Sequence, residues 1–254
     1  MKNNLVMAAT IAAVTFTVAP PVAAKQFWAD YSVSYLQGSD YLDPFTGTEY
    51  DSGVITLEHA SGHSWGSTFS FVDFLDNQDG YNDETYGEVG ANFNLGNHFG
   101  KPDEGGFVKD YYVAGQVEFQ TGSDGFENYL LGFGMDLNVP GASYFSVTYY
   151  RRNNDDLGIG REDNDQLTIA WGFDHGNWRF DGFWDIRSST ENDFGDVDAA
   201  YNFTPQLKYN IGKALLGMDS GRLDVGVEYV YWKNKFGVDG QTEKNANLLV
   251  KWHY

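Results

Sequence analysis

The end of the chain alternates strictly between the two faces of a strand. Over residues 246–254 one face carries apolar or aromatic side chains, and the other face is mostly polar or charged. The apolar face consists of Ala246, Leu248, Val250, Trp252 and Tyr254. A tilted strand of about this length spans a membrane, and a terminal aromatic strand is typical of barrels that close by pairing their last strand with their first. The segment therefore predicts a transmembrane strand that presents one face to lipid and one to water.

Alternation at every second residue recurs in about twelve runs of strand length, an even number as single-chain bacterial barrels require. The runs start near Phe27, Val54, Trp65, Tyr86, Tyr111, Tyr129, Tyr144, Gln166, Trp178, Asn202, Leu223 and Ala246. Such alternation keeps mean hydropathy low, here −0.44, although one face of each strand is oily. We therefore predict an all-β fold, a transmembrane antiparallel up-and-down β-barrel of about twelve strands.

The connections agree with this fold in part. Those after odd-numbered strands look long and polar, whereas Asn138–Ser143 and Asp174–Asn177 read as tight turns after even-numbered ones. Short periplasmic turns and longer extracellular loops are expected when both termini lie in the periplasm. Two even connections, Gly96–Phe107 and Gly212–Arg222, are longer than this rule predicts.

The first residues read as a secretory signal peptide. Lys2 precedes an apolar stretch from Leu5 to Val18, and small residues at Val22 and Ala24 predict cleavage after Ala24. We assign residues 1–24 to a cleaved signal peptide and 25–254 to a single barrel domain in the bacterial outer membrane, in contact with its lipid and lipopolysaccharide.

Charge and composition exclude several classes of function. The net charge of −20 and the absence of a basic stripe argue against nucleic acid as a partner. Acidic side chains gather in the predicted loops Asp76–Glu84 and Asn153–Asp156, either as solvated loops or as ligands for divalent cations between lipopolysaccharides. The chain has no cysteine, which excludes disulfides and thiol catalysis, and no residue pattern predicts a cofactor or a resident metal.

The ninth strand shows which face is inward. In Trp178–Arg187 one face carries Arg179 and Arg187 among acidic residues. A basic side chain facing mid-bilayer lipid costs roughly 2–4 kcal/mol, so this face must line the lumen. Arg151 and Arg152 are adjacent, so one of them points outward; Arg151 at an outer strand end is placed to reach a lipid phosphate by snorkelling.

The same parity gives a set of lumen residues that combines charged groups, amides and aromatic rings. A barrel of this size is wider than a filled one and narrower than an open porin, which suits a selective pore. The candidate substrate-binding residues are Trp28, Asp30, Tyr86, Glu88, Tyr112, Gln116, Glu118, Asp136, Arg152, Arg179, Asp181, Phe183, Asp185 and Arg187. Tyr150, Lys208, Asp224, Glu228, Trp232, Lys251 and His253 share their inward parity. Such residues either satisfy one another or, as a set, bind a neutral heterocycle on a hydroxylated sugar.

A succession of segments resembles one family of channels. FSFVDFLD (69–76) with Tyr86–Glu88 resembles the aromatic and acidic strand of the Tsx-like nucleoside-specific channel-forming outer-membrane family, which includes OmpK-type phage receptors. Further segments similar to that family follow in its order: Phe107–Gln116, Asn128–Asp136, Val139–Ser143, Tyr149–Arg151 and Phe180–Asp185. The resemblance implies a twelve-stranded barrel that passes nucleosides by facilitated diffusion, with outer loops that phages or bacteriocins use. The parity shared by Phe69, Phe71 and Asp73 points them toward lipid, unless a bulge or the strand end turns Asp73 inward.

Two other classes of function are weighed against a channel. An outer-membrane hydrolase would use Glu58–His63, where His59 and His63 flank Ser61. That cluster is predicted at the turn after the second strand, and its spacing supplies neither an oriented base nor an oxyanion hole, so we predict no enzyme. A phage or bacteriocin receptor, or a structural barrel without selective transport, remains open as an alternative to nucleoside passage.

Overall fold

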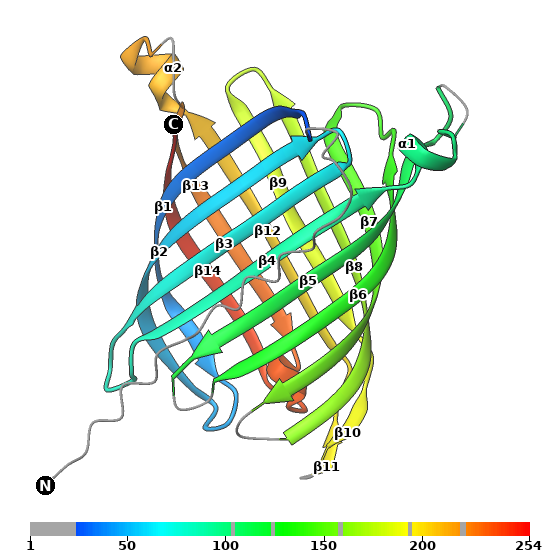
Figure 1. Cartoon of the computed structure of the whole chain (residues 1–254). Coiled ribbons are helices and arrows are strands. Elements are labelled where there is room, and N and C mark those ends of the chain that lie inside the picture. Colours follow the sequence, from blue (N-terminus) through cyan, green and yellow to red (C-terminus); the bar gives the residue numbers. More distant parts are fainter. Residues whose placement is uncertain (1–23, 103–104, 123–124, 157–159, 193–194, 219–221) are drawn as a thin grey trace, which may run out of the picture.

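The computed structural model describes residues 24–254 except 103–104, 123–124, 157–159, 193–194 and 219–221. Residues 1–23 of the predicted signal peptide lie outside the described residues. The described chain forms a closed antiparallel barrel of steeply tilted strands (Figure 1). This arrangement confirms the predicted up-and-down barrel with twelve strands in the wall.

The wall follows the order of the chain almost without exception. Its first half consists of β1 (Gln26–Asp43), β2 (Thr48–His63), β3 (Gly66–Asn77), β4 (Glu84–Asn94), β5 (Val108–Thr121) and β6 (Phe126–Leu137). Its second half consists of β7 (Ala142–Asp156), β8 (Gly160–His175), β9 (Trp178–Arg187), β12 (Ala200–Asn210), β13 (Arg222–Lys233) and β14 (Thr242–His253). A two-stranded sheet of β10 (Thr190–Asn192) and β11 (Gly195–Val197) stands apart from the wall.

The barrel closes where the sequence places its terminal aromatic strand. β14 pairs antiparallel with β1, from Ser32 opposite His253 to Gln37 opposite Leu248. On its other side β14 pairs with β13 along its whole length, from Thr242 to His253. Closure leaves the wall without a free edge strand, because every backbone edge within it finds a neighbour.

The predicted contrast between long and short connections is only partly right. The strands run further than their alternation suggests: β2 starts at Thr48 rather than Val54, and β7 includes the predicted loop Asn153–Asp156. Several connections after odd-numbered strands are therefore short, among them 44–47 and 122–125. The outward positions of these strand ends carry polar residues, so a search for apolar alternation does not detect them.

The two exceptional connections contain short helices. α1 (Gly96–Phe99) follows β4, and α2 (Ile211–Leu216) follows β12. Figure 1 shows both at the end of the barrel that holds the C-terminus, and we call this end the terminal end. β10, β11 and the short 3₁₀ helix η1 (Lys235–Gly237) lie at the opposite end, which we call the loop end.

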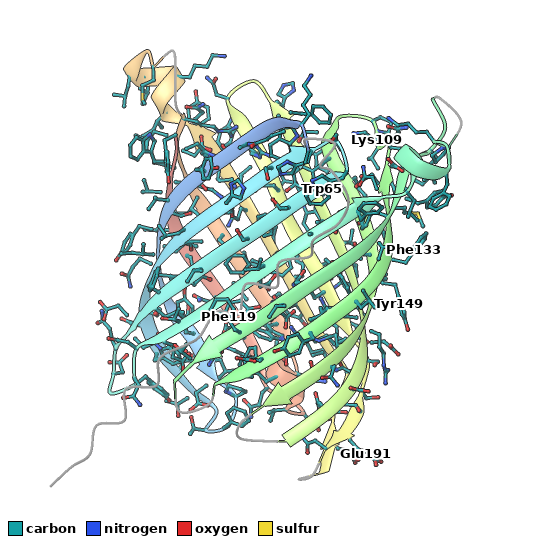
Figure 2. The ribbon with its side chains drawn as sticks, viewed as in Figure 1. Trp65, Lys109, Phe119, Phe133, Tyr149 and Glu191 are labelled. Carbon is teal, nitrogen blue, oxygen red and sulfur yellow. The ribbon has the colours of Figure 1, made fainter. Side chains whose placement is uncertain are left out.

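The wall is apolar outside and polar inside, the reverse of a water-soluble protein. Leu131 and Leu248 are 68% and 70% exposed, whereas Lys208 and Asn245 are 2% and 0% exposed. Phe133 and Tyr149 project outward from β6 and β7 (Figure 2). An apolar surface that surrounds the molecule is far larger than the patches that monomeric soluble proteins expose, and it suits contact with lipid acyl chains.

Among the described residues, no helix has both the length and the apolar character needed to cross a membrane.

The barrel lumen as the candidate functional site

A cavity of about 2170 Å³ runs through the barrel and is lined by inward side chains of every wall strand. Thirteen of the fourteen predicted site residues line it, and Glu118 alone does not. Glu118 is 1% exposed and lies behind the lining, in contact with Arg152. Parity along each strand thus separates inward from outward positions, but it does not say which inward groups reach the open lumen.

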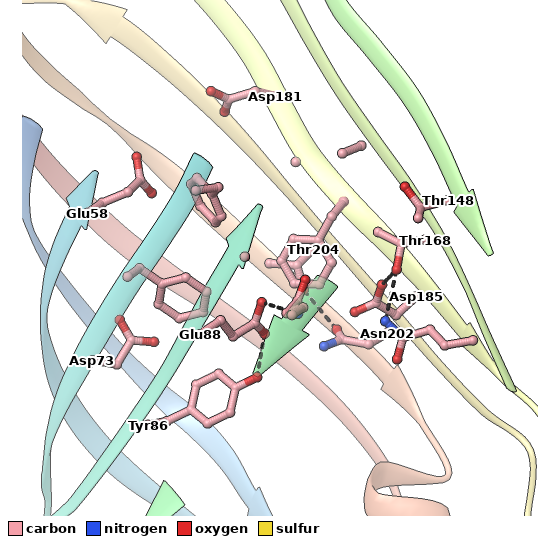
Figure 3. Close-up of a pocket in the computed structure, with 18 of the residues that line it drawn as sticks. Glu58, Asp73, Tyr86, Glu88, Thr148, Thr168, Asp181, Asp185, Asn202 and Thr204 are labelled. Carbon is pink, nitrogen blue, oxygen red and sulfur yellow. Dashed lines mark hydrogen bonds between the residues drawn. The ribbon is translucent and has the colours of Figure 1, made fainter. Parts of the chain in front are cut away.

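One wall of the lumen combines aromatic rings with a carboxylate and an amide. The ring centroids of Phe71 in β3 and Tyr86 in β4 are 5.7 Å apart, and Phe69 lies 5.9 Å from Phe71. Glu88 accepts a hydrogen bond from the Tyr86 hydroxyl and another from Gln116 Nε2 at 2.8 Å. Figure 3 shows Tyr86 and Glu88 projecting into the lumen. We call these five residues the β3–β5 wall.

The predicted lipid-facing orientation of Phe69, Phe71 and Asp73 is wrong. All three line the lumen, and Asp73 accepts a hydrogen bond from Thr56 Oγ1 at 2.6 Å. The register sets this orientation, because Phe71 pairs with Glu88 and Asp73 pairs with Tyr86, and directly paired residues share a face. Val72 and Phe74 take the outer face instead, so β3 is apolar on both faces and its alternation is ambiguous.

Beside this wall, a buried ion pair anchors a polar network. Arg152 Nη2 lies 2.7 Å from Glu118 Oε2, and both side chains are 2% exposed. Asn128 donates a hydrogen bond to the same Glu118 oxygen at 3.1 Å. Gln166 Oε1 accepts hydrogen bonds from Arg152 and, at 3.1 Å, from Arg187 Nε. The network fills the lumen beside β5–β9 near the loop end and fixes the direction of the Arg187 side chain.

Charged groups also line the lumen toward the terminal end, and most cations there have a carboxylate partner. Lys208 Nζ lies 2.8 Å from Asp181 Oδ1, and Arg179 Nε lies 2.8 Å from Asp181 Oδ2. Lys251 Nζ of β14 lies 2.6 Å from Glu58 Oε1 of β2, and β1 lies between these two strands in the wall. Each of these cations is thus paired with a carboxylate, which offsets the cost of burying its charge. This is the first alternative of the sequence analysis, in which inward residues satisfy one another.

Several lumen residues were missed by the sequence reading. The rings of Phe126, Phe236, Tyr41 and Tyr50 line the cavity. Phe126 begins its strand, and Phe236 lies in the connection after β13, outside any alternating run. Tyr41 and Tyr50 lie in strand ends beyond the alternation, and their ring centroids are 5.8 Å apart. No local signal marks such residues, because their position depends on how the connections fold over the barrel end.

The predicted hydrolase-like cluster forms the last residues of β2, which ends at His63 directly before the turn to β3. Ser61 Oγ lies 3.2 Å from His59 Nε2, 2.8 Å from His63 Nε2 and 2.6 Å from Thr68 Oγ1. The neighbours Glu58, Ala60 and Gly62 line the lumen, so His59 and Ser61 lie on the outer face, whereas His63 at the end of the strand also borders the cavity. Ser61 is 1% exposed, which leaves its hydroxyl closed to an attacking geometry.

Arg151 projects outward as predicted from its neighbour Arg152. Its guanidinium lies 3.2 Å from Asp165 Oδ1 and 3.5 Å from Asp163 Oδ2, and its side chain is 56% exposed. These acidic partners come from β8, beside the polar end of β7. The carboxylates balance the charge of Arg151 at the loop end.

The comparisons with known proteins concern the fold. No family model matches the sequence, and no curated protein matches it. Among solved structures, the NanC porin is similar with a TM-score of 0.52 and 13% identity, over 88% of this chain and 98% of the porin. The KdgM porin gives a TM-score of 0.47 and 12% identity, over 88% of this chain and 99% of the porin. The similarity to the NanC porin shows that this chain has the fold of a barrel solved before.

Proposed function

We propose that this chain is a passive outer-membrane channel for small polar solutes that carry a planar ring, and that nucleosides are its substrates. The β3–β5 wall carries the proposal. It sets aromatic faces beside a carboxylate and an amide, with the Phe71 and Tyr86 rings 5.7 Å apart and Gln116 2.8 Å from Glu88. Stacking on rings is tolerant of base identity, whereas carboxylates and amides bind ribose hydroxyls directionally.

The rest of the lumen supports passage rather than storage. A cavity of about 2170 Å³ exceeds the usual 300–1,000 Å³ of a closed ligand pocket, and its residues come from both barrel ends. The opposite wall offers Asp185 and Asn202, which Figure 3 shows facing the lumen across from Tyr86 and Glu88. Thr168 donates to Asp185 at 2.6 Å, so this carboxylate is held in place for a passing solute.

Conductance in a planar bilayer tests the proposal. The purified mature protein is titrated with adenosine and thymidine, with maltose as the control solute. Saturable block by the nucleosides, and none by maltose, is the expected result. A steady conductance that nucleosides do not change would refute nucleoside passage and favour a phage or bacteriocin receptor, whose site would lie on the loop end.

A further inference from the structure

The connection between β13 and β14 places a phenyl ring across the mouth of the lumen. The Phe236 ring centroid lies 4.8 Å from that of Trp232 and 6.3 Å from that of Phe126. Trp232 belongs to β13 and Phe126 to β6, and these strands are separated by four strands on one side of the closed sheet and six on the other. Phe236 therefore bridges nearly opposite walls at the loop end.

The backbone around this ring is tethered on both sides. Lys235 Nζ contacts Glu243 Oε2 at 2.5 Å and donates to the Leu42 carbonyl at 2.8 Å. The Gly237 carbonyl accepts a hydrogen bond from the Asp198 amide at 2.9 Å. The short helix η1 is thus fixed to β1, to β14 and to the segment before β12, so the ring could change position only by rotation of the Phe236 side chain.

Two features around Phe236 are energetically unfavourable. Phe236 has φ 54° and ψ 23°, the left-handed region that side chains larger than glycine or asparagine rarely adopt. The Trp232 indole N–H beside it is buried and has no hydrogen-bond partner among the described residues. A buried donor without an acceptor loses its hydration without compensation. The buried indole N–H would gain a partner if the phenyl ring moved and an acceptor took its place.

A second donor group lies over the Trp232 ring. The Arg187 guanidinium lies 5.8 Å from the Trp232 ring centroid, and its Nε donates to Gln166. No carboxylate of the described residues lies within 4.0 Å of this guanidinium, in contrast to Arg152 and Arg179. The indole N–H lacks any acceptor among the described residues and the guanidinium lacks a carboxylate partner there, so a ligand that brings its own acceptor oxygen to these rings would meet two donors.

We propose that Phe236 covers a binding site at the loop end for a planar ring that carries acceptor oxygens. The incoming ring replaces the phenyl on Trp232, and its oxygen accepts hydrogen bonds from Trp232 Nε1 and Arg187. Phe236 thereby determines which solutes enter the pore. The site rests on the proposed function only in using the same lumen, and it specifies a chemistry, ring plus carbonyl or anionic oxygen, that nucleoside passage by itself does not require.

Ion conductance without any solute tests the cover. Phe236→Ala is expected to raise the single-channel conductance in potassium chloride, because the bridge between the walls is lost. Phe99→Ala, at an 83% exposed ring in α1 at the other barrel end, is the matched control and keeps the original conductance. Equal conductance of Phe236→Ala and the unaltered protein would refute the proposal that the Phe236 ring covers the lumen.

Uracil and pyrimidine test the ligand, because both are planar six-membered rings of similar size, and uracil offers two carbonyl oxygens where pyrimidine offers only the weaker acceptor lone pairs of its ring nitrogens. Uracil is expected to block the unaltered channel about tenfold more tightly than pyrimidine, and Trp232→Phe, which keeps a stacking ring but removes the N–H, should erase most of that difference. An unchanged preference in Trp232→Phe would overturn the site even where adenosine still blocks the channel. Block by uracil but not by nucleosides would refute nucleoside passage and leave the site standing.

Discussion

Arg151 and Arg152 are neighbours in sequence that occupy opposite environments. The Arg152 side chain is 2% exposed and paired with an equally buried Glu118, whereas the Arg151 side chain is 56% exposed. A buried pair contributes little net stability, but removal of one partner leaves an uncompensated charge. The consequence of losing a guanidinium therefore depends on facing, which alternates with each residue along the strand.

Arg152→Met should lower the free energy of unfolding by about 3 kcal/mol, because Glu118 is left buried without a cation. Urea unfolding in lipid vesicles, followed by tryptophan fluorescence, measures this loss. Arg151→Met is the matched control and should destabilise the barrel much less, since exposed ion pairs are weak. Equal losses in the two variants would show that Glu118 is solvated rather than buried.

Glu88→Gln should weaken nucleoside block about tenfold, because a carboxylate acceptor beside the Tyr86 ring becomes a weaker, neutral acceptor. The inhibition constant for adenosine in planar bilayers measures the change. Glu127→Gln, at an exposed carboxylate on the outside of β6, should leave that constant unaltered. An equal change in both variants would show that Glu88 of the β3–β5 wall does not contribute to nucleoside binding.

Ser61→Ala should leave conductance and nucleoside block unchanged, because its hydroxyl lies on the outer face of β2, away from the lumen. The expected cost is about 1 kcal/mol of stability from the lost hydrogen bonds to His59 and His63. Assays of the unaltered protein and the variant on a phospholipid and on a soluble ester complete the test. An ester hydrolysis that disappears in Ser61→Ala would instead identify an enzyme.

At the scale of the element, the strands are fitted to one another by close backbone approach. A Cβ at Gly226 in β13 would collide with the Leu207 carbonyl of the paired strand β12. At Gly115 in β5 the same atom would meet nothing within 4 Å. The close approach of β12 therefore requires a glycine at position 226, whereas packing does not require one at position 115.

Gly226→Val should destabilise the barrel by about 1–3 kcal/mol, because β12 and β13 must move apart to accept the side chain. Gly115→Val should be neutral or slightly stabilising, since valine favours strands. The fraction of heat-resistant, compact barrel on an unboiled denaturing gel compares the two variants. A larger loss in Gly115→Val would contradict the packing argument.

At the scale of the whole molecule, the excess of carboxylates over cations extends into the pore. The chain has 36 Asp and Glu against 16 Lys and Arg. Lumen cations such as Lys208 and Lys251 are paired with carboxylates. Asp73 and Glu228 accept hydrogen bonds from neutral donors, Thr56 for the first and Gln206 and Asn247 for the second. Acidic side chains therefore outnumber Lys and Arg among the described residues that line the lumen.

The channel should consequently prefer cations over anions, as the reversal potential in a potassium chloride gradient measures. The preference should fall as the salt concentration is raised from about 0.1 M to about 1 M, because the Debye length shrinks from roughly 10 Å to roughly 3 Å. Preference for chloride at low salt would show that the paired cations, and not the carboxylates, dominate the field in the pore.

The sequence by itself determined the strand count, the closure and the facing of most wall residues. Alternation with a period of two is a local property of the chain, and a charged side chain such as Arg179 has only one tolerable face in a membrane. Thirteen of the fourteen predicted lumen residues line the cavity for this reason.

The tertiary structure decided what depends on neighbours. The facing of Phe71 and Asp73 follows from the register of β3 against β4, because β3 is apolar on both faces. The withdrawal of Glu118 from the lumen depends on Arg152 arriving from β7. Phe236 reaches the lumen through a connection anchored to three separate parts of the barrel. Each is a contact between residues distant in sequence, and a pattern of period two carries no information about such contacts.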